Sequence, residues 1–278
     1  MNEAAPQGVT VVTATAGRPD LMLQKLEALT RQTLARDRFE WRITMDGADP
    51  GLEKRLRAAC PEDLAMHVTT TPGVGPGPAR DAAARDARFG VLVFSDDDCL
   101  PPPDLLERHL AAQAEPAVYV GAITFDDGVQ PWHWHARRPN WGNVNGANTS
   151  CPTSAFHAVG GFGDALVGYG GEDVWLGWRL TQDGLAVKAL PGAPVRHVGP
   201  APQRRINAGR MREAGANAAR IAAMDPRTAW RLGVHPVQRV VKDVFLSIVR
   251  PFGGATVQRE CAYLEGVKSA RQTGRGPA

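Results

Sequence analysis

Short apolar runs alternate with helical patterns through the first 100 residues. Strand-like runs, rich in β-branched and aromatic residues, occur at 9–14, 39–45, 67–70 and 91–94. Between these runs, apolar residues recur near helical spacing at 21–32, 52–59 and 79–89. Pro78 suits the first turn of the last of these helices. This order predicts an α/β fold with a mainly parallel central sheet, right-handed crossovers and helices on both faces.

The pattern after residue 100 is less regular. Helices are expected at 105–114 and 172–182, and strands at 117–123, 186–190 and 195–197. Residues 125–150 are expected to be irregular. From about residue 204 the pattern is helical to the end, with interruptions at Pro226, Pro236 and Pro251. We therefore expect an α/β domain at 1–203, with halves at 8–100 and 101–203, and a helical extension at 204–278.

Composition excludes several classes of protein. The 30 glycines and 22 prolines among 278 residues follow no repeat, which excludes a collagen-like chain. No run of 18 apolar residues occurs, and the N-terminus lacks the pattern of a secretory signal. The cysteines form no CxxC pair and no zinc spacing; they are Cys60, Cys99, Cys151 and Cys261. We expect a globular, cytoplasmic protein with reduced thiols.

The net charge of +3 conceals an asymmetry along the chain. Residues 1–199 hold 18 Lys/Arg and 24 Asp/Glu, a net charge of −6, whereas residues 200–278 hold 14 and 5, a net charge of +9. Apolar residues in the basic tail form one helical stripe, at positions 237, 240, 241, 244, 245 and 248. The stripe would pack against the rest of the chain or a second subunit, which is the more economical reading, or lie on an anionic membrane.

Three consecutive carboxylates, Asp96, Asp97 and Asp98, follow the buried apolar run at 91–94. In open parallel sheets, ligands collect outside the carboxyl ends of the strands. A hard divalent cation such as Mg²⁺ or Mn²⁺ would relieve the mutual repulsion of these acids. A solvated acidic turn that caps the next helix would account for the triplet equally well, so the triplet alone leaves both readings open.

Four segments together resemble a known family: Val9–Thr15 with Arg18-Pro19, Met45–Ala48, Pro78–Ala83 and Phe94–Asp98. The chain looks like the GT-A nucleotide-sugar glycosyltransferases, which have a Rossmann-like sheet, and is most similar to glycosyltransferase family 2. The resemblance implies that Asp96 and Asp98, as a D-x-D signature, hold Mn²⁺ or Mg²⁺ and the donor diphosphate. It further implies donor-binding roles for Thr13, Thr15, Arg18, Asp46, Arg80 and Asp97. His197 would be a third metal ligand, although a lone histidine is also compatible with a structural role.

A second signature spans 160–163 and 168–180, where Glu172 and Asp173 follow two glycines. It resembles the acceptor-side segment of inverting GT-A enzymes, in particular of galactosyltransferases. A carboxylate in the first turn of a helix is favoured in its ionised form and can accept a proton from an acceptor hydroxyl. Asp173 is the expected catalytic base, with Glu172 as an acceptor-binding neighbour or alternate base. The other reading is that the pair only caps the helix.

Acceptor-binding candidates lie around this signature. They are Trp132, Trp141, Asn148 and Gly171. Indole faces can stack on sugar rings and amides can bind hydroxyls, although tryptophans in such a segment can equally pack in a core or a lid.

The expected activity is metal-dependent, inverting transfer of one sugar per encounter from a nucleotide diphosphate sugar, UDP-sugar by default. The Q-x-x-R-W motif of processive synthases is absent. The acceptor would be a glycan, a lipid-linked molecule or a small molecule, in surface glycan or glycolipid synthesis, and no nucleic acid is expected as a partner. The C-terminal helices leave open a homodimer or contact with the inner face of the membrane. The alternatives are a sugar-phosphate nucleotidyltransferase and a catalytically inactive carbohydrate-binding homologue.

Overall fold

The computed structural model describes residues 7–128, 138–166, 168–199, 207–250 and 253–273, and the chain forms two compact units. The first unit comprises residues 1–163 and 176–201, and the second comprises 164–175 and 202–278. This division lies close to the expected boundary between 203 and 204. The segment 164–175, which we expected within the α/β domain, groups instead with the C-terminal helices.

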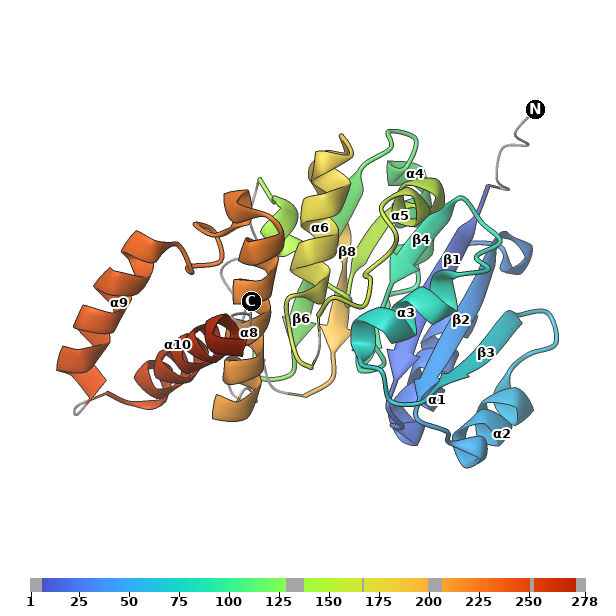
Figure 1. The fold of residues 1–278 in the computed structure, drawn as a ribbon. Coiled ribbons are helices and arrows are strands. Elements are labelled where there is room, and N and C mark those ends of the chain that lie inside the picture. The colour runs from blue at the N-terminus through green and yellow to red at the C-terminus, as the bar shows by residue number, and fades with distance from the viewer. Residues whose placement is uncertain (1–6, 129–137, 167, 200–206, 251–252, 274–278) are drawn as a thin grey trace. The chain divides into compact units, whose positions relative to one another are not determined.

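The first unit is built on one eight-stranded sheet with the order β3-β2-β1-β4-β7-β6-β8-β5 (Figure 1). The strands are β1 (Val9–Thr15), β2 (Phe39–Asp46), β3 (Ala65–Thr71), β4 (Val91–Phe94), β5 (Cys99–Leu100), β6 (Val118–Phe125), β7 (Thr149–Pro152) and β8 (Val187–His197). Strands β1 to β4 are parallel, as are β6 and β8, whereas β7 and β5 run antiparallel to their neighbours. The expected GT-A architecture is confirmed, with a mixed sheet flanked by helices.

Alternate residues of β4 separate two hydrophobic cores, one on each face of the sheet. Val91 and Val93 face a core with α1 (Pro19–Thr30), α2 (Pro50–Ala59) and two side chains of α4 (Leu105–Ala112). Leu92 and Phe94 face the other core, with α3 (Pro76–Ala84), α5 (Thr153–Ala158) and the later turns of α6 (Glu172–Gln182). Two short 3₁₀ helices, η1 (Arg36–Arg38) and η3 (Trp141–Asn143), join these elements. The helices therefore cover both faces, as the sequence pattern predicts.

Several predicted boundaries are corrected by the structure. The helix expected at 79–89 is α3, which begins at Pro76 because Gly75, with φ of 92°, caps it and Pro76 takes the first turn. The two strands expected at 186–190 and 195–197 are one strand, β8, with a β-bulge opposite β6 and Ala193 at φ of 46°. The short elements β5, β7 and α5 were not predicted, because each has too few residues to show a period.

The second unit contains α8 (Ala208–Met224), the 3₁₀ helix η4 (Pro226–Thr228), α9 (Pro236–Val249) and α10 (Ala255–Thr273). Helices α8 and α10 approach closely where a Cβ on Gly215 would collide with the carbonyl of Tyr263, and one on Gly266 with the carbonyl of Arg212. Pro226 and Pro236 open new elements as expected, and Pro251 lies outside the described residues. Among the described residues, no helix is both long and apolar enough to cross a membrane.

Candidate active site

The predicted acidic turn lies at the carboxyl edge of the sheet, and a histidine from a distant strand reaches it. Strand β4 ends at Phe94, and the turn that follows is closed by a hydrogen bond from the Cys99 amide to the carbonyl of Asp96, 3.0 Å. His197, the last residue of β8, is in register with Cys99. The Val198 amide donates to the carbonyl of Asp98 at 2.8 Å. Residues about 100 positions apart in the sequence therefore meet at this edge.

The donor set at this point suits a divalent cation. Ligand atoms of Asp98, Cys99 and His197 all lie within 4.8 Å of one another. His197 Nε2 is 3.3 Å from Asp98 Oδ1, and His197 Nδ1 is buried with no hydrogen-bond partner among the described residues. Burial raises the pKa of the Cys99 thiol well above its usual value, so the carboxylate and the imidazole are the better ligands. Carboxylate with imidazole fits Mn²⁺ or a similar ion.

Two arginines pair with the acidic triplet. Arg18 lies 2.5 Å from Asp98 and 3.2 Å from Asp97, and Arg80 lies 2.5 Å from Asp96. Burial raises the pKa of Asp97 above its ordinary value, and Arg18 and the Thr15 hydroxyl, which donates to Asp97 at 2.8 Å, oppose that shift. Because the carboxylates and guanidinium groups meet here, the site has both cation ligands and cations suited to phosphate oxygens.

Lys25, which is not among the predicted site residues, holds the acidic turn from within the core. Its side chain is fully buried and donates to Ser95 Oγ at 2.6 Å and to the carbonyls of Asp96 and Cys99, both at 2.8 Å. Burial lowers the pKa of Lys25, while the nearby acidic groups oppose that shift. A signal existed in the sequence, since Lys25 interrupts the apolar face that Met22 and Leu29 define on α1.

Helix α3 connects the acidic turn to the glycine segment at 160–163. Arg80, almost fully buried, fits beside Asp96 only because residue 146 is glycine: a Cβ there would collide with the guanidinium of Arg80. The next residue, Asp81, accepts hydrogen bonds from the amides of Phe162 at 2.7 Å and Gly163 at 2.9 Å. The two adjacent side chains thus fix two different loops to one helix.

Thr13 and Asp46, both expected to bind the donor, are engaged within the protein. The fully buried Thr13 hydroxyl accepts from Trp41 Nε1 at 3.0 Å and donates to the carbonyl of Ser95 at 2.9 Å. Asp46 accepts from the Thr71 hydroxyl and from the amides of Val74 and Gly75, at 2.7 to 2.8 Å. Thr13 supports the acidic turn through Ser95, and Asp46 orders the loop that leads into α3.

The acceptor-binding candidates of the first unit differ in how far their side chains are buried. Asn148 is fully buried, with its Oδ1 2.9 Å from His109 Nε2 and its Nδ2 donating to the carbonyl of Ala122 at 2.8 Å. Trp141 packs edge to face on Trp178 with ring centroids 5.1 Å apart. Trp132 lies outside the described residues. Of these three, only Trp141 is described with a partly exposed side chain.

The Glu172–Asp173 pair begins α6 and belongs to the second unit, whereas the acidic turn belongs to the first. The loop before the pair is held by α8. Glu213 accepts from the Tyr169 amide at 2.7 Å, and the fully buried Asn217 donates to the carbonyl of Gly170 at 2.8 Å.

Gly171, the last residue of that loop, has φ of 102°, a conformation that favours glycine. A Cβ at Gly171 would lie 3.2 Å from Ile221 and 3.3 Å from Asn217. The helical extension, which we expected to lie outside the resemblance, therefore supports the start of the Glu172–Asp173 helix. The sequence carried no signal for this contact, because the two segments are more than 40 residues apart.

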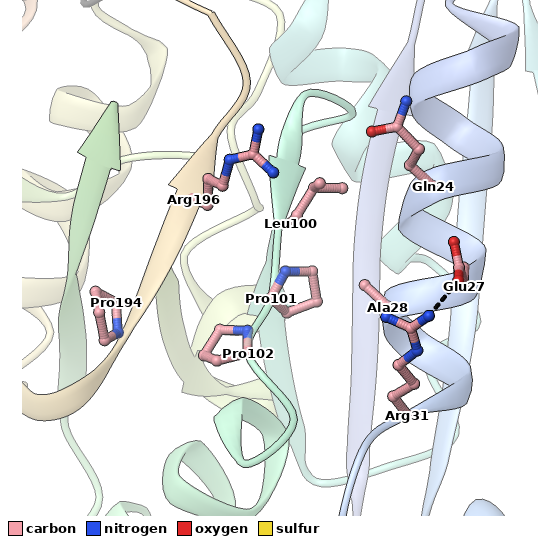
Figure 2. A pocket seen from close by; sticks show the side chains of 9 residues that line it. All are labelled: Gln24, Glu27, Ala28, Arg31, Leu100, Pro101, Pro102, Pro194 and Arg196. Atoms are coloured by element: carbon pink, nitrogen blue, oxygen red, sulfur yellow. Dashed lines mark hydrogen bonds and ion pairs between the residues drawn. The ribbon is translucent and has the colours of Figure 1, made fainter. Parts of the chain in front are cut away.

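A hollow of about 320 Å³ lies on the first unit between α1 and the strands β5 and β8 (Figure 2). Its wall includes Leu100 with the two prolines after it, and two arginines. Arg31 forms an ion pair with Glu27, and Arg196 one with Asp126 at 2.9 Å. None of the predicted site residues lines the hollow, although Leu100 and Arg196 are the chain neighbours of Cys99 and His197.

Comparisons with known proteins match the chain to glycosyltransferases. The model of glycosyl transferase family 2 matches residues 10–163, and that of the N-terminal domain of galactosyltransferase matches residues 128–199. The validoxylamine A glucosyltransferase of Streptomyces hygroscopicus subsp. jinggangensis is 29% identical over 64% of this chain and 52% of its own length. That of S. hygroscopicus subsp. limoneus is also 29% identical, over 48% of its length. The chain thus spans about half the length of these curated relatives.

Solved structures share the fold at low sequence identity. The mannosyltransferase PcManGT from Pyrobaculum calidifontis, in complex with GDP-Man and Mn²⁺, has a TM-score of 0.68 at 14% identity, covering 98% of this chain and 88% of that chain. S. aureus TarS 1–349, in complex with UDP, has a TM-score of 0.59 at 16% identity, covering 96% and 92%. The similarity to both extends over nearly the whole chain.

Proposed function

The chain belongs to glycosyl transferase family 2, and we propose that it is a glycosyltransferase that moves one sugar per encounter from a nucleotide diphosphate sugar to an acceptor hydroxyl. The proposed reaction requires a divalent cation and inverts the anomeric carbon. The observation that carries the proposal is the convergence of Asp98 and His197, 3.3 Å apart, beside the arginine-paired acids of the same turn.

We propose a UDP-sugar as the donor, and of its parts the nucleobase is the one for which the support is weakest. The solved relatives bind different nucleotides, since PcManGT is in complex with GDP-Man and TarS with UDP. The curated relatives are named for validoxylamine A, which supports a small-molecule acceptor alongside glycan and lipid-linked ones. We propose a cytoplasmic location for the reaction, where nucleotide sugars are available.

On the donor side, Asp98 and His197 would hold the cation, with Asp96 as a further ligand once Arg80 releases it. A divalent ion there would neutralise charge on the departing diphosphate. Arg18 and Arg80 carry fixed positive charge beside the same acids and would bind the diphosphate oxygens. Because Arg80 is 6% exposed, its charge acts in a poorly hydrated environment, where it stabilises a developing anion more strongly than in water.

On the acceptor side, Asp173 would take the proton from the attacking hydroxyl, and Glu172 would bind the acceptor or replace Asp173 as base. Both lie in the first turn of α6, at the positive end of the helix dipole. A hydroxyl deprotonated by one base attacks the anomeric carbon directly from the face opposite the leaving group. This single displacement inverts the configuration.

The first test measures thermal stabilisation by a panel of nucleoside diphosphates with and without Mn²⁺. A nucleotide at 100 times its dissociation constant adds about 2.7 kcal/mol to the stability of the folded chain, which raises Tm by roughly 5–10 °C for a chain of this size. Asp98→Asn should remove the Mn²⁺-dependent part, whereas Asp63→Asn, at an acid 67% exposed and remote from the acidic turn in the sequence, should not. No metal-dependent shift with any nucleotide would disprove the proposal.

The second test separates sugar transfer from the alternative of nucleotidyl transfer. Loss of a general base lowers the rate by about 10²–10⁴-fold, so Asp173→Asn should reduce sugar transfer to that extent while leaving nucleotide binding intact. A nucleotidyltransferase would keep its activity in the same variant. The anomeric configuration of the product, read by NMR, tests the displacement itself, and retention would refute the role of Asp173 as the only base.

A further inference from the structure

Helix α9 of the second unit exposes an apolar face. Six apolar side chains of this face are 58–66% exposed: Val237, Val240, Val241, Val244, Phe245 and Ile248. They recur at the three- and four-residue spacing of one helical stripe. Singly exposed apolar residues are ordinary on protein surfaces, but a contiguous stripe of this kind marks an interaction site.

The charged side of α9 faces its neighbour α10. Lys242 lies 3.0 Å from Glu260 of α10, and Asp243 lies 2.8 Å from Lys268 of the same helix. Leu246 is the only residue of α9 that is buried. The usual arrangement of a surface helix, with apolar residues inward and charges outward, is therefore reversed. The stripe is not the surface by which α9 packs within its own unit.

Positive charge accompanies the apolar stripe. Residues 200–278 carry a net charge of +9. Exposed Arg231 lies shortly before the helix, and Arg250, 68% exposed, lies directly after it. Trp230, 60% exposed, precedes Arg231, and tryptophan is enriched where a protein meets the boundary between lipid and water.

We propose that α9 binds the surface of an anionic lipid bilayer, with its apolar stripe among the acyl chains and the flanking arginines at the headgroups. Helices that lie in the membrane interface combine an apolar face with cations in this way. A second copy of the chain fits the same stripe less well, because dimerisation through it would bring two basic tails of +9 together. An anionic surface is complementary to that charge. The proposal does not depend on the proposed glycosyl transfer.

The test is flotation of the full chain with vesicles of phosphatidylcholine alone or containing 30% phosphatidylglycerol. We expect binding to the anionic vesicles and a fall in binding as salt is raised. Val241→Ser with Phe245→Ser should weaken binding at least about tenfold, because both side chains lose most of their transfer free energy. Arg250→Ala should weaken it about fivefold on anionic vesicles only. Met224→Ser, at an apolar residue 43% exposed on another helix, is the matched control and should bind as the wild type does.

Three results would overturn the proposal. The first is no preference of the wild-type chain for anionic vesicles. The second is a concentration-dependent dimer in the absence of lipid that the Val241→Ser, Phe245→Ser variant abolishes, because the stripe would then be a subunit interface. The third is a Tm of that variant lowered by several degrees, which would show that the stripe packs against the chain itself. Glycosyl transfer is not measured in any of these assays, so failure here leaves the proposed function standing.

Discussion

The buried ammonium of Lys25 offers a sharp test of how the acidic turn is held. Lys25→Met keeps the length and apolar stem of the side chain and removes its charge and donors. Three bonds are lost, to Ser95 Oγ and to the carbonyls at the two ends of the turn, Asp96 and Cys99. The variant therefore leaves a buried hydroxyl and two carbonyls without their charged partner, in the turn that carries the triplet.

The expected change in the free energy of unfolding is the sum of opposing contributions. Each hydrogen bond from a charged donor contributes about 1.5–3 kcal/mol, while removing the ammonium relieves a desolvation cost of several kcal/mol. Breaking a buried charged network by deleting one partner costs about 3–5 kcal/mol in sum, and we expect that loss in the free energy of unfolding. Because outer-shell partners of metal ligands contribute about 10–100-fold to metal affinity, Mn²⁺ binding should weaken by at least tenfold.

Urea denaturation and Mn²⁺ titration of the same samples provide the two measurements. Lys54→Met, at an exposed position of α2, is the control for the substitution itself. Ser95→Ala removes only one of the three bonds and should fall between wild type and Lys25→Met in both assays, which keeps the test usable if Lys25→Met does not fold. A loss of stability below about 1 kcal/mol, or unchanged Mn²⁺ affinity, would refute the view that Lys25 positions the turn.

Three further predictions concern other contacts. Asn217→Ala should lower kcat with little change in the KM for the donor, because it removes the bond to Gly170 that supports the start of α6. Steady-state kinetics with a varied donor measures both constants. If the residue were only structural, kcat and the KM for the donor would change together. Gly146→Ala should displace Arg80 from Asp96 and raise the KM for the donor. Gly254→Ala, where the added Cβ has nothing within 4 Å and the backbone is not in the left-handed region, should leave the KM for the donor unchanged in the same assay. Burial lowers the pKa of His109 from 6.5 to about 4. Between pH 6.5 and pH 4 this histidine is therefore protonated in the unfolded chain but not in the folded chain. Because the unfolded chain binds one more proton there, the free energy of unfolding should fall by about 3 kcal/mol as the pH drops from 6.5 to 4. Urea midpoints across that range should be less pH-dependent in His109→Gln, and an unchanged slope would contradict the assignment.

The α9 stripe shows where pattern and structure diverge. Its helical spacing was evident in the sequence, and the more economical reading was that the stripe packs against the rest of the chain or a second subunit. Within the second unit, the structure turns the charged side of α9 toward α10, because Lys242 and Asp243 find oppositely charged partners there. Periodicity identifies an amphipathic face, but it carries no information on which face the neighbouring helix pairs with.

The strands β1, β2 and β4 and the polar residues at their carboxyl ends could be predicted from the sequence alone. Apolar runs and their breakers are local, and parallel strands bring their ends to one edge of a sheet, where Arg18 meets Asp97 and Asp98. The start of α6 at Glu172 was also evident, since two glycines precede the pair of acids.

Which distant groups meet depends on how the chain folds, and the sequence pattern does not show it. Lys25 beneath the acidic turn, Asn148 bound to His109 in the core, and Asn217 supporting Gly170 all join elements far apart in the chain. Such contacts depend on how helices pack on the sheet and on one another, and their energy comes from burial and from hydrogen bonds made only after packing. A one-dimensional pattern shows that a polar residue is buried, as at Lys25, but not which groups satisfy it.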